Sequence, residues 1–140
     1  MESRAIDSVL RAASEIDLDA RPTFEQIRAA FPIVASFDEG AITVGRFSGT
    51  TPWERHTDSD EFLHVLDGEV EITVLTDGAS EQVLVPKGAI FVVPRGHWHR
   101  QVARPVVTLL SLIPTDHGPV SFAEDPRVEA SFAVIPPVRV

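Results

Sequence analysis

Two histidines and two glutamates stand at close, regular spacing in segments whose composition is typical of short β-strands. Glu54 and His56 are two residues apart, Glu61 follows after four intervening residues, and His99 lies farther along the chain. Residues two apart in a strand point to one face, so Glu54 and His56 are expected to share it. Such groups are costly inside a β-barrel unless they share a partner, and a metal ion is the obvious shared partner.

Turn signals separate these short segments and define the expected fold class. Residues 69–74 alternate between apolar and polar side chains, which is typical of a half-buried strand, and Asp67-Gly68 before them predicts a hairpin turn. Residues 89–93 predict a short buried strand, and residues 105–113 a long apolar one. Short strands with turn signals about every ten residues favour an all-β sandwich or barrel.

Helical patterns are confined to the start of the chain. Apolar residues between positions 6 and 16 follow helical spacing, and a second short helix is predicted between Pro22 and Pro32. Prolines after position 114 preclude a long regular element there. We therefore predict one domain in three parts: an N-terminal helical arm at 1–32, a β-barrel at 33–114, and an irregular C-terminal tail at 115–140 that packs on the barrel or on a partner subunit.

Composition excludes several classes of partner and ligand. The chain has 140 residues, with 12 basic and 21 acidic side chains and a formal charge of −9, which disfavours nucleic acid and anionic membranes. Cysteine is absent, so disulfides and thiolate ligands are excluded. No apolar run approaches the roughly 20 residues that span a bilayer, and the N-terminus lacks an apolar signal core. We expect a cytoplasmic protein.

The polar set and the glycines around it resemble the two motifs of the cupin superfamily. The first family motif is G-x5-H-x-H-x(3,4)-E-x6-G, and its second half is matched by His56, Glu61 and Gly68. The second family motif is G-x5-P-x-G-x2-H-x3-N, and this chain matches it at Gly88, Pro94, Gly96 and His99. Both motifs occur in order about twenty residues apart, which makes the resemblance specific.

The chain departs from the cupin pattern at three motif positions. Glu54 stands where the first motif has its first histidine, Gly49 lies one residue nearer than the opening glycine, and Ala103 replaces the final asparagine. The change at position 54 has the largest consequence, because it alters the ligand set of the metal.

The cupin resemblance implies a double-stranded β-helix, or jelly-roll, barrel with one metal at its centre and frequent assembly as a homodimer. Its ligands would be His56, Glu61 and His99, with Glu54 as a fourth ligand, as a general base beside the metal, or as the ion-pair partner of an arginine. Two imidazoles and a carboxylate suit non-haem Fe(II), and a second carboxylate favours Fe(II) or Mn(II). Zn and Ni also remain possible as the bound metal. The arginines that could form an ion pair with Glu54 are Arg46, Arg55 and Arg100.

Strand alternation predicts which other side chains reach the barrel interior. Gln101 lies on the face of His99, and His97 lies in the turn at the mouth of the barrel. His64 is expected to face away from Glu61, and His117 in the proline-rich tail is given no role. A mostly apolar pocket for a small, partly apolar organic molecule is predicted from Phe47, Leu63, Val65, Ile90, Val92 and Leu110.

Two classes of function follow from this site. The first is a small metal-dependent enzyme that polarises an oxygen-bearing organic molecule, with dioxygenation and isomerisation or cyclisation both open. The alternative is a non-catalytic ligand-binding or sensing module. The fold does not decide between them, because one fold supports many functions.

Overall fold

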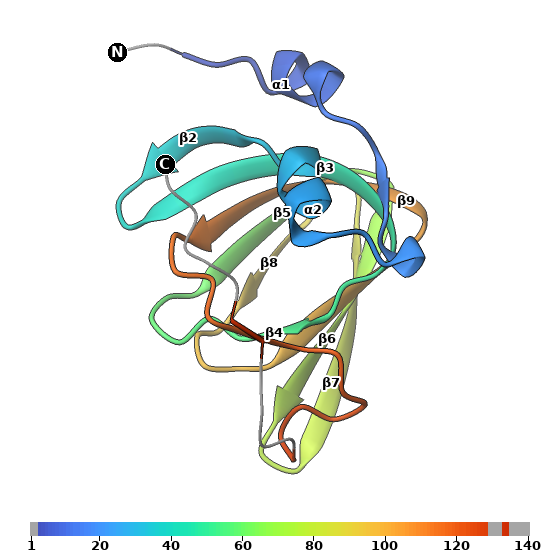
Figure 1. Ribbon diagram of the computed structural model, residues 1–140, viewed down its shortest axis with the longest axis vertical. Helices are drawn as coiled ribbons and strands as arrows, with labels where there is room; N and C mark the ends of the chain where they lie inside the picture. Colours follow the sequence, from blue (N-terminus) through green and yellow to red (C-terminus); the bar gives the residue numbers. More distant parts are fainter. Residues whose placement is uncertain (1–2, 129–132, 135–140) are drawn as a thin grey trace.

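The computed structural model describes residues 3–128, 133 and 134, and within them eleven strands form a curved sheet around an apolar interior (Figure 1). The helical elements are α1 (Ile6–Ala12), the 3-10 helix η1 (Leu18–Ala20) and α2 (Phe24–Ala30). The first six strands are β1 (Ile16–Asp17), β2 (Ile33–Phe37), β3 (Gly40–Thr50), β4 (Trp53–Glu54), β5 (Glu61–Asp67) and β6 (Glu69–Thr76). The others are β7 (Ala79–Pro86), β8 (Ile90–Val93), β9 (His99–Pro114), β10 (Pro119–Ser121) and β11 (Ala133–Val134).

The long strand β9 joins the two walls of the barrel. Its first residues pair antiparallel with β4 and β6, with His99 opposite both Glu54 and Val74. Its second half pairs antiparallel with β3 and β5. One continuous strand therefore carries His99 at one end and the core of the opposite wall at the other.

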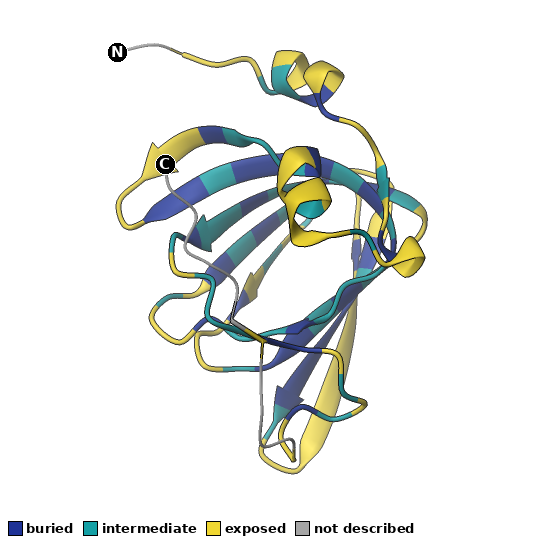
Figure 2. Cartoon of the chain, in the orientation of Figure 1, coloured by how far each residue is buried: buried dark blue, intermediate teal, exposed yellow. Residues whose placement is uncertain are grey.

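The apolar interior is built by alternation along these strands. Figure 2 shows buried and partly buried residues alternating along β3 and β5. The interior cluster includes Phe47, Leu63, Val65, Ile72 and Leu109, all fully or almost fully buried. Each such side chain contributes about 1.5–3 kcal/mol of transfer free energy, so this cluster is the main source of stability. The all-β barrel expected from the sequence is confirmed.

The N-terminal helices cover the barrel in two different ways. Leu10 of α1 packs on the outer side of the sheet against Val34 and Val44, and the Arg46 guanidinium donates to the carbonyl oxygens of Leu10 and Ala13 at 2.9 and 3.1 Å. A cation placed there satisfies carbonyl groups that the end of a helix leaves without partners. This contact attaches α1 to β3.

Helix α2 begins with a capping box and closes one end of the interior. Thr23 accepts from the Gln26 amide, and the Gln26 side chain accepts from the Thr23 amide, which satisfies two N-terminal amides. Ile27 and Phe31 pack against the interior cluster, where the Phe31 and Phe47 rings lie 5.9 Å apart. The predicted second helix is therefore confirmed, with Thr23 rather than Pro22 at its start. None of the helices in the described residues is long and apolar enough to cross a membrane.

The strand predictions are confirmed in type but not everywhere in burial. Residues 69–74 lie in β6, and Gly68 makes the preceding turn with a φ of +75°. Residues 105–113 belong to β9, which begins six residues earlier than expected. The prediction that 89–93 is a buried strand was wrong, because Ile90 and Val92 of β8 are 59% and 46% exposed.

Part of the C-terminal segment pairs with the barrel. β10 lies antiparallel to β4, with Val120 opposite Glu54. The Arg127 guanidinium donates to the carbonyl oxygens of Thr76 and Ala79 at the turn between β6 and β7, at 2.8 and 2.9 Å. Residues 129–132 and 135–140 lie outside the described residues, and the three-part division of the chain stays a prediction.

Candidate metal centre

Three separate segments carry the predicted ligand side chains to one place. Glu61 is the first residue of β5, and His99 is the first residue of β9. Glu54 ends the two-residue strand β4 directly opposite His99. His56 lies two residues beyond β4, outside any strand, and its carbonyl oxygen accepts from the Gly96 amide at 2.6 Å.

The ligand atoms of these residues converge in the interior. Oε2 of Glu61 lies 2.8 Å from Nε2 of His99 and 3.5 Å from Nε2 of His56. One ligand atom each from Glu54, His56 and His99 lies within 4.8 Å of the other two. The exposed fractions of His56, Glu61 and His99 are 2%, 3% and 1%, so water does not compete freely for these atoms.

The converging atoms have no hydrogen bonds that would explain their burial. Nε2 of His56, Nε2 of His99 and Oε2 of Glu61 are buried, and none makes a hydrogen bond of acceptable geometry to another described residue. The 2.8 Å contact between Glu61 and His99 is an ion pair when the His99 ring is protonated. Buried polar atoms are costly without partners. Two imidazole nitrogens and a carboxylate oxygen around one point fit a divalent cation.

Electrostatics within the cluster hold the carboxylate charged and the imidazoles basic. Burial alone would lower the pKa of His56, but the Glu61 carboxylate outweighs burial and, with Glu54, raises that pKa to about 9. The pKa of His99 is raised by the same carboxylates against the effect of burial. Burial would raise the pKa of Glu61, but the two imidazoles hold it well below its usual range. The cluster is therefore arranged around a negative charge.

Backbone carbonyl groups orient both imidazole rings. Nδ1 of His56 lies 2.8 Å from the carbonyl oxygen of His117, and Nδ1 of His99 lies 3.3 Å from that of His97. A carbonyl can only accept, so Nδ1 of each ring is the donor and Nε2 is left to face the interior. This outer hydrogen bond is the usual way in which a metal-binding histidine is held.

Sequence reasoning missed His117, which the structure places beside the candidate centre. Its ring lies 5.0 Å from the ring of His56, and its Nδ1 is buried without a hydrogen-bond partner among the described residues. The next residue, Gly118, has a φ of +73°, and a Cβ there would collide with the carbonyl oxygen of Arg55. Only glycine lets the chain approach so closely. No local signal identifies His117, because its position depends on the pairing of β10 with β4.

The predicted pocket residues have different surroundings. Gln101 is buried on the face of His99, and its Oε1 has no hydrogen-bond partner among the described residues. Phe47 and Leu63 are fully buried members of the interior cluster. His97 lies in an exposed turn with its Nδ1 3.2 Å from the Arg95 carbonyl oxygen. Of these four, Gln101 is the polar side chain that is buried on the same face as a candidate ligand.

Three residues predicted to line the interior lie on the opposite face. Ile90 and Val92 point outward from β8, and Leu110 packs with Leu10 of α1 on the outer side of the sheet. All three arginines considered as partners of Glu54 make contacts elsewhere, and Cζ of Arg55 lies 4.9 Å from the centre of the Trp98 ring. Arg46 bonds to the end of α1, and Cζ of Arg100 lies 4.4 Å from the centre of the Trp53 ring.

The fold and this cluster define an all-β barrel with a candidate metal centre of two histidines and two carboxylates. The model of the cupin domain family (Cupin_2) matches residues 46–110. Residues 46–110 are therefore a cupin domain. No curated protein matches the chain.

Solved structures of several proteins share the fold at low sequence identity. A cupin-2 domain containing protein from Shewanella frigidimarina is 17% identical with a TM-score of 0.55, over 79% of this chain and 99% of that protein. Hydroquinone 1,2-dioxygenase PnpCD in complex with Cd2+ and 4-hydroxybenzonitrile is 23% identical with a TM-score of 0.50, over 57% of this chain. Fe(II)-HppE with an alternative substrate is 18% identical with a TM-score of 0.51, over 59% of this chain. The chain spans 60% and 47% of the last two proteins, respectively.

Proposed function

We propose that this cupin domain holds one divalent metal ion with His56, Glu61, His99 and Glu54, and that it acts there on a small organic molecule. The observation that carries the proposal is the convergence of buried ligand atoms that lack hydrogen-bond partners among the described residues. The metal-containing dioxygenase and Fe(II) neighbours support the same type of site. Two histidines and a carboxylate favour Fe(II), and the second carboxylate keeps Mn(II) in competition.

The bound cation would supply Lewis-acid polarisation of an oxygen-bearing substrate, in dioxygenase-type or isomerase-type chemistry. The protein's own residues orient and enclose that substrate. Gln101 offers a buried amide on the face of His99, and its Oε1 is free of hydrogen bonds within the described part of the chain. Glu54 is partly exposed at the edge of the cluster, where it either completes the ligand set or accepts a proton from the substrate.

Metal analysis of the untagged protein tests this function. We would reconstitute the wild type without oxygen with Fe(II), Mn(II), Zn(II) or Ni(II), remove excess ion, and measure the bound metal by elemental analysis. We expect about one ion per chain, and its loss in His99→Ala, because that variant removes a central ligand. His64→Ala is the matched control, since His64 lies on the other face of β5 and should keep the metal.

The variant Glu54→Ala separates the two roles of that residue. Loss of metal would make Glu54 a ligand, whereas retention of metal with loss of turnover would make it a base. Substrate-dependent oxygen uptake by the iron form would identify oxygenase chemistry. A wild-type protein that retains none of the four metals would contradict the proposed function.

A further inference from the structure

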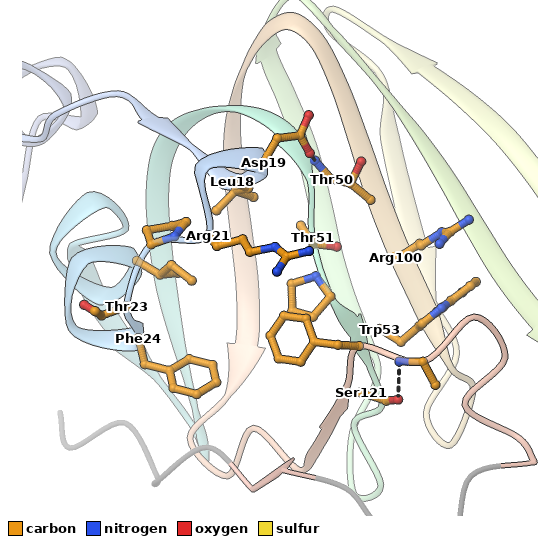
Figure 3. Close-up of a pocket in the computed structure, with 15 residues that line it drawn as sticks. Leu18, Asp19, Arg21, Thr23, Phe24, Thr50, Thr51, Trp53, Arg100 and Ser121 are labelled. Atoms are coloured by element: carbon orange, nitrogen blue, oxygen red, sulfur yellow. Dashed lines mark hydrogen bonds between the residues drawn. The ribbon is translucent and has the colours of Figure 1, made fainter.

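A cavity lies on the other side of the strands that carry the candidate metal residues. It has a volume of about 540 Å³ and is enclosed by η1, the start of α2, the link between β3 and β4, and the segment after β10 (Figure 3). Trp53 and Arg100 belong to its lining, and they are the chain neighbours of Glu54 and His99. Neighbouring residues of a strand point to opposite faces, so this cavity is separate from the candidate metal centre.

The cavity carries a positive charge in a strongly acidic protein. Two guanidinium groups, those of Arg21 and Arg100, belong to its lining. Its one carboxylate, Asp19, is already neutralised, because it accepts from Arg104 and from the Thr50 amide at 2.9 Å each. These bonds hold the pKa of Asp19 below its ordinary value. Figure 3 shows Arg21 extending from η1 toward Thr51 and away from Asp19.

Donor groups in this lining lack acceptors. Trp53 is 4% exposed, yet its indole Nε1 has no hydrogen-bond partner among the described residues. The Nε of Arg100 is also buried without such a partner, and its guanidinium is held over the Trp53 ring at 4.4 Å. No described residue forms an ion pair or hydrogen bond with the Arg21 side chain. Buried donors without partners are rare, so their presence in residues that line this cavity calls for an explanation.

Much of the remaining lining is apolar, beside the hydroxyl groups of Thr23, Thr50, Thr51 and Ser121. Pro22, Phe24 and Pro52 line the cavity, and so does Phe122, which is 76% exposed. A ligand that covers an exposed aromatic side chain buries a large apolar area, which favours binding. A cavity of this volume lies within the range of small-molecule sites, about 300–1,000 Å³.

We propose that this cavity is a binding site for a small organic acid. The guanidinium groups of Arg21 and Arg100 pair with its carboxylate, and the proline and phenylalanine side chains contact its apolar or aromatic body. A planar carboxylate is an anion that the fork of a guanidinium matches with two hydrogen bonds. The two arginines, without a lysine cluster, favour one carboxylate over a polyphosphate.

Binding of 3-phenylpropionate is the direct test. The protein has two tryptophans, so its nitrogen-15-labelled form gives two indole signals by NMR, which Trp98→Phe assigns. We expect 3-phenylpropionate to shift the Trp53 signal to saturation, and the neutral 3-phenylpropanamide to leave it in place. Arg21→Gln should weaken binding about tenfold or more, because it removes a charged hydrogen-bond donor. Arg28→Gln is the control, since Arg28 is exposed on α2 and does not line the cavity.

The same titration separates this site from the metal centre. Binding should be unchanged after treatment with EDTA and in His99→Ala, so the proposed function can fail without affecting this result. A second variant, Arg100→Gln, should also weaken binding in the folded protein. The site is refuted by a Trp53 signal that does not saturate, by equal binding of the amide, by wild-type affinity in Arg21→Gln, or by loss of binding with the metal.

Discussion

In two short segments of this protein, the inner face carries metal-binding types of side chain and the outer face carries arginines. In the segments Trp53–His56 and Trp98–Gln101, the inner residues are Glu54, His56, His99 and Gln101. The outer residues are two tryptophans and two arginines that pair across the strands. Cζ of Arg55 lies 4.9 Å from the centre of the Trp98 ring, and Cζ of Arg100 lies 4.4 Å from that of Trp53. The inner face can hold a cation, whereas the outer face supplies its own cations.

The difference between the faces comes from how each satisfies its charges. On the outer side, a guanidinium group gains attraction from the face of an indole ring while it stays partly exposed to water. On the inner side, Glu61 is buried between two imidazoles whose Nε2 atoms have no aligned partner among the described residues. Strand alternation separates the two sets by a single backbone layer, which prevents the arginines from neutralising the carboxylates.

The largest effect is expected from removing the inner charge. Glu61→Gln keeps the shape of the side chain and removes the carboxylate that both imidazoles contact. We expect the metal-free protein to lose about 3 kcal/mol of unfolding free energy at pH 7, because one member of a buried ion pair is lost. Urea denaturation measures the loss.

Asp67→Asn is a matched control at the other end of the same strand. Asp67 pairs with Lys87 at 2.9 Å, but both side chains are 68% exposed. Water and salt screen such pairs, so the loss of this pair should lower the free energy of unfolding far less than Glu61→Gln does. Equal losses in the two variants would show that burial does not distinguish the inner pair from a surface pair.

A smaller effect is expected where the C-terminal segment approaches the inner face. Gly118→Ala places a Cβ against the carbonyl oxygen of Arg55 at a φ of +73° and should displace the His117 carbonyl from His56. Gly78→Ala carries the same conformational cost at a φ of +89°, with no atom within 4 Å of the new Cβ. We expect about 1 kcal/mol of destabilisation for Gly78→Ala and about 2 kcal/mol or more for Gly118→Ala.

Thermal or urea unfolding of both variants measures how much unfolding free energy each substitution removes. The excess in Gly118→Ala should be accompanied by a changed NMR signal of the His56 ring, since its Nδ1 loses a carbonyl acceptor. Equal destabilisation in the two variants would mean that the segment after β9 moves away from Arg55 without loss of stability. That segment would then not position the His56 ring.

The fold could be predicted because its signals are local. Alternation at 69–74 predicted β6. The hairpin predicted at Asp67-Gly68 was wrong, because β5 pairs with β8 and β9 whereas β6 pairs with β7 and β9. Alternation failed on β8, where Val93 rather than Val92 shares the face of its partner Glu61. Hydrophobicity alone does not show which residues of a strand face the interior, because a continuous apolar run is apolar on both faces.

The parts of the two sites that come from distant segments could not be predicted. His117 reaches His56 across sixty-one positions through the pairing of β10 with β4. Arg21 and Arg100 share a cavity because η1 and β9 meet through the bonds of Asp19 to Thr50 and Arg104. A single sequence contains the residues of such contacts but no local spacing that links them.

The smallest effect is expected on the outer face, where a double-mutant cycle measures the pair of Trp53 and Arg100. We would compare wild type, Trp53→Leu, Arg100→Gln and the double variant by urea denaturation. Trp53→Leu alone should cost several times the coupling energy, because it removes a buried aromatic side chain. The coupling itself should be about 0.5–1 kcal/mol, as for a guanidinium group stacked on an indole ring at a partly exposed site. It should also fall little with added salt, in contrast to a surface ion pair. A coupling of zero would leave the outer arginines as ordinary solvated charges. A coupling as large as the cost of Glu61→Gln would remove the energetic difference between the two faces.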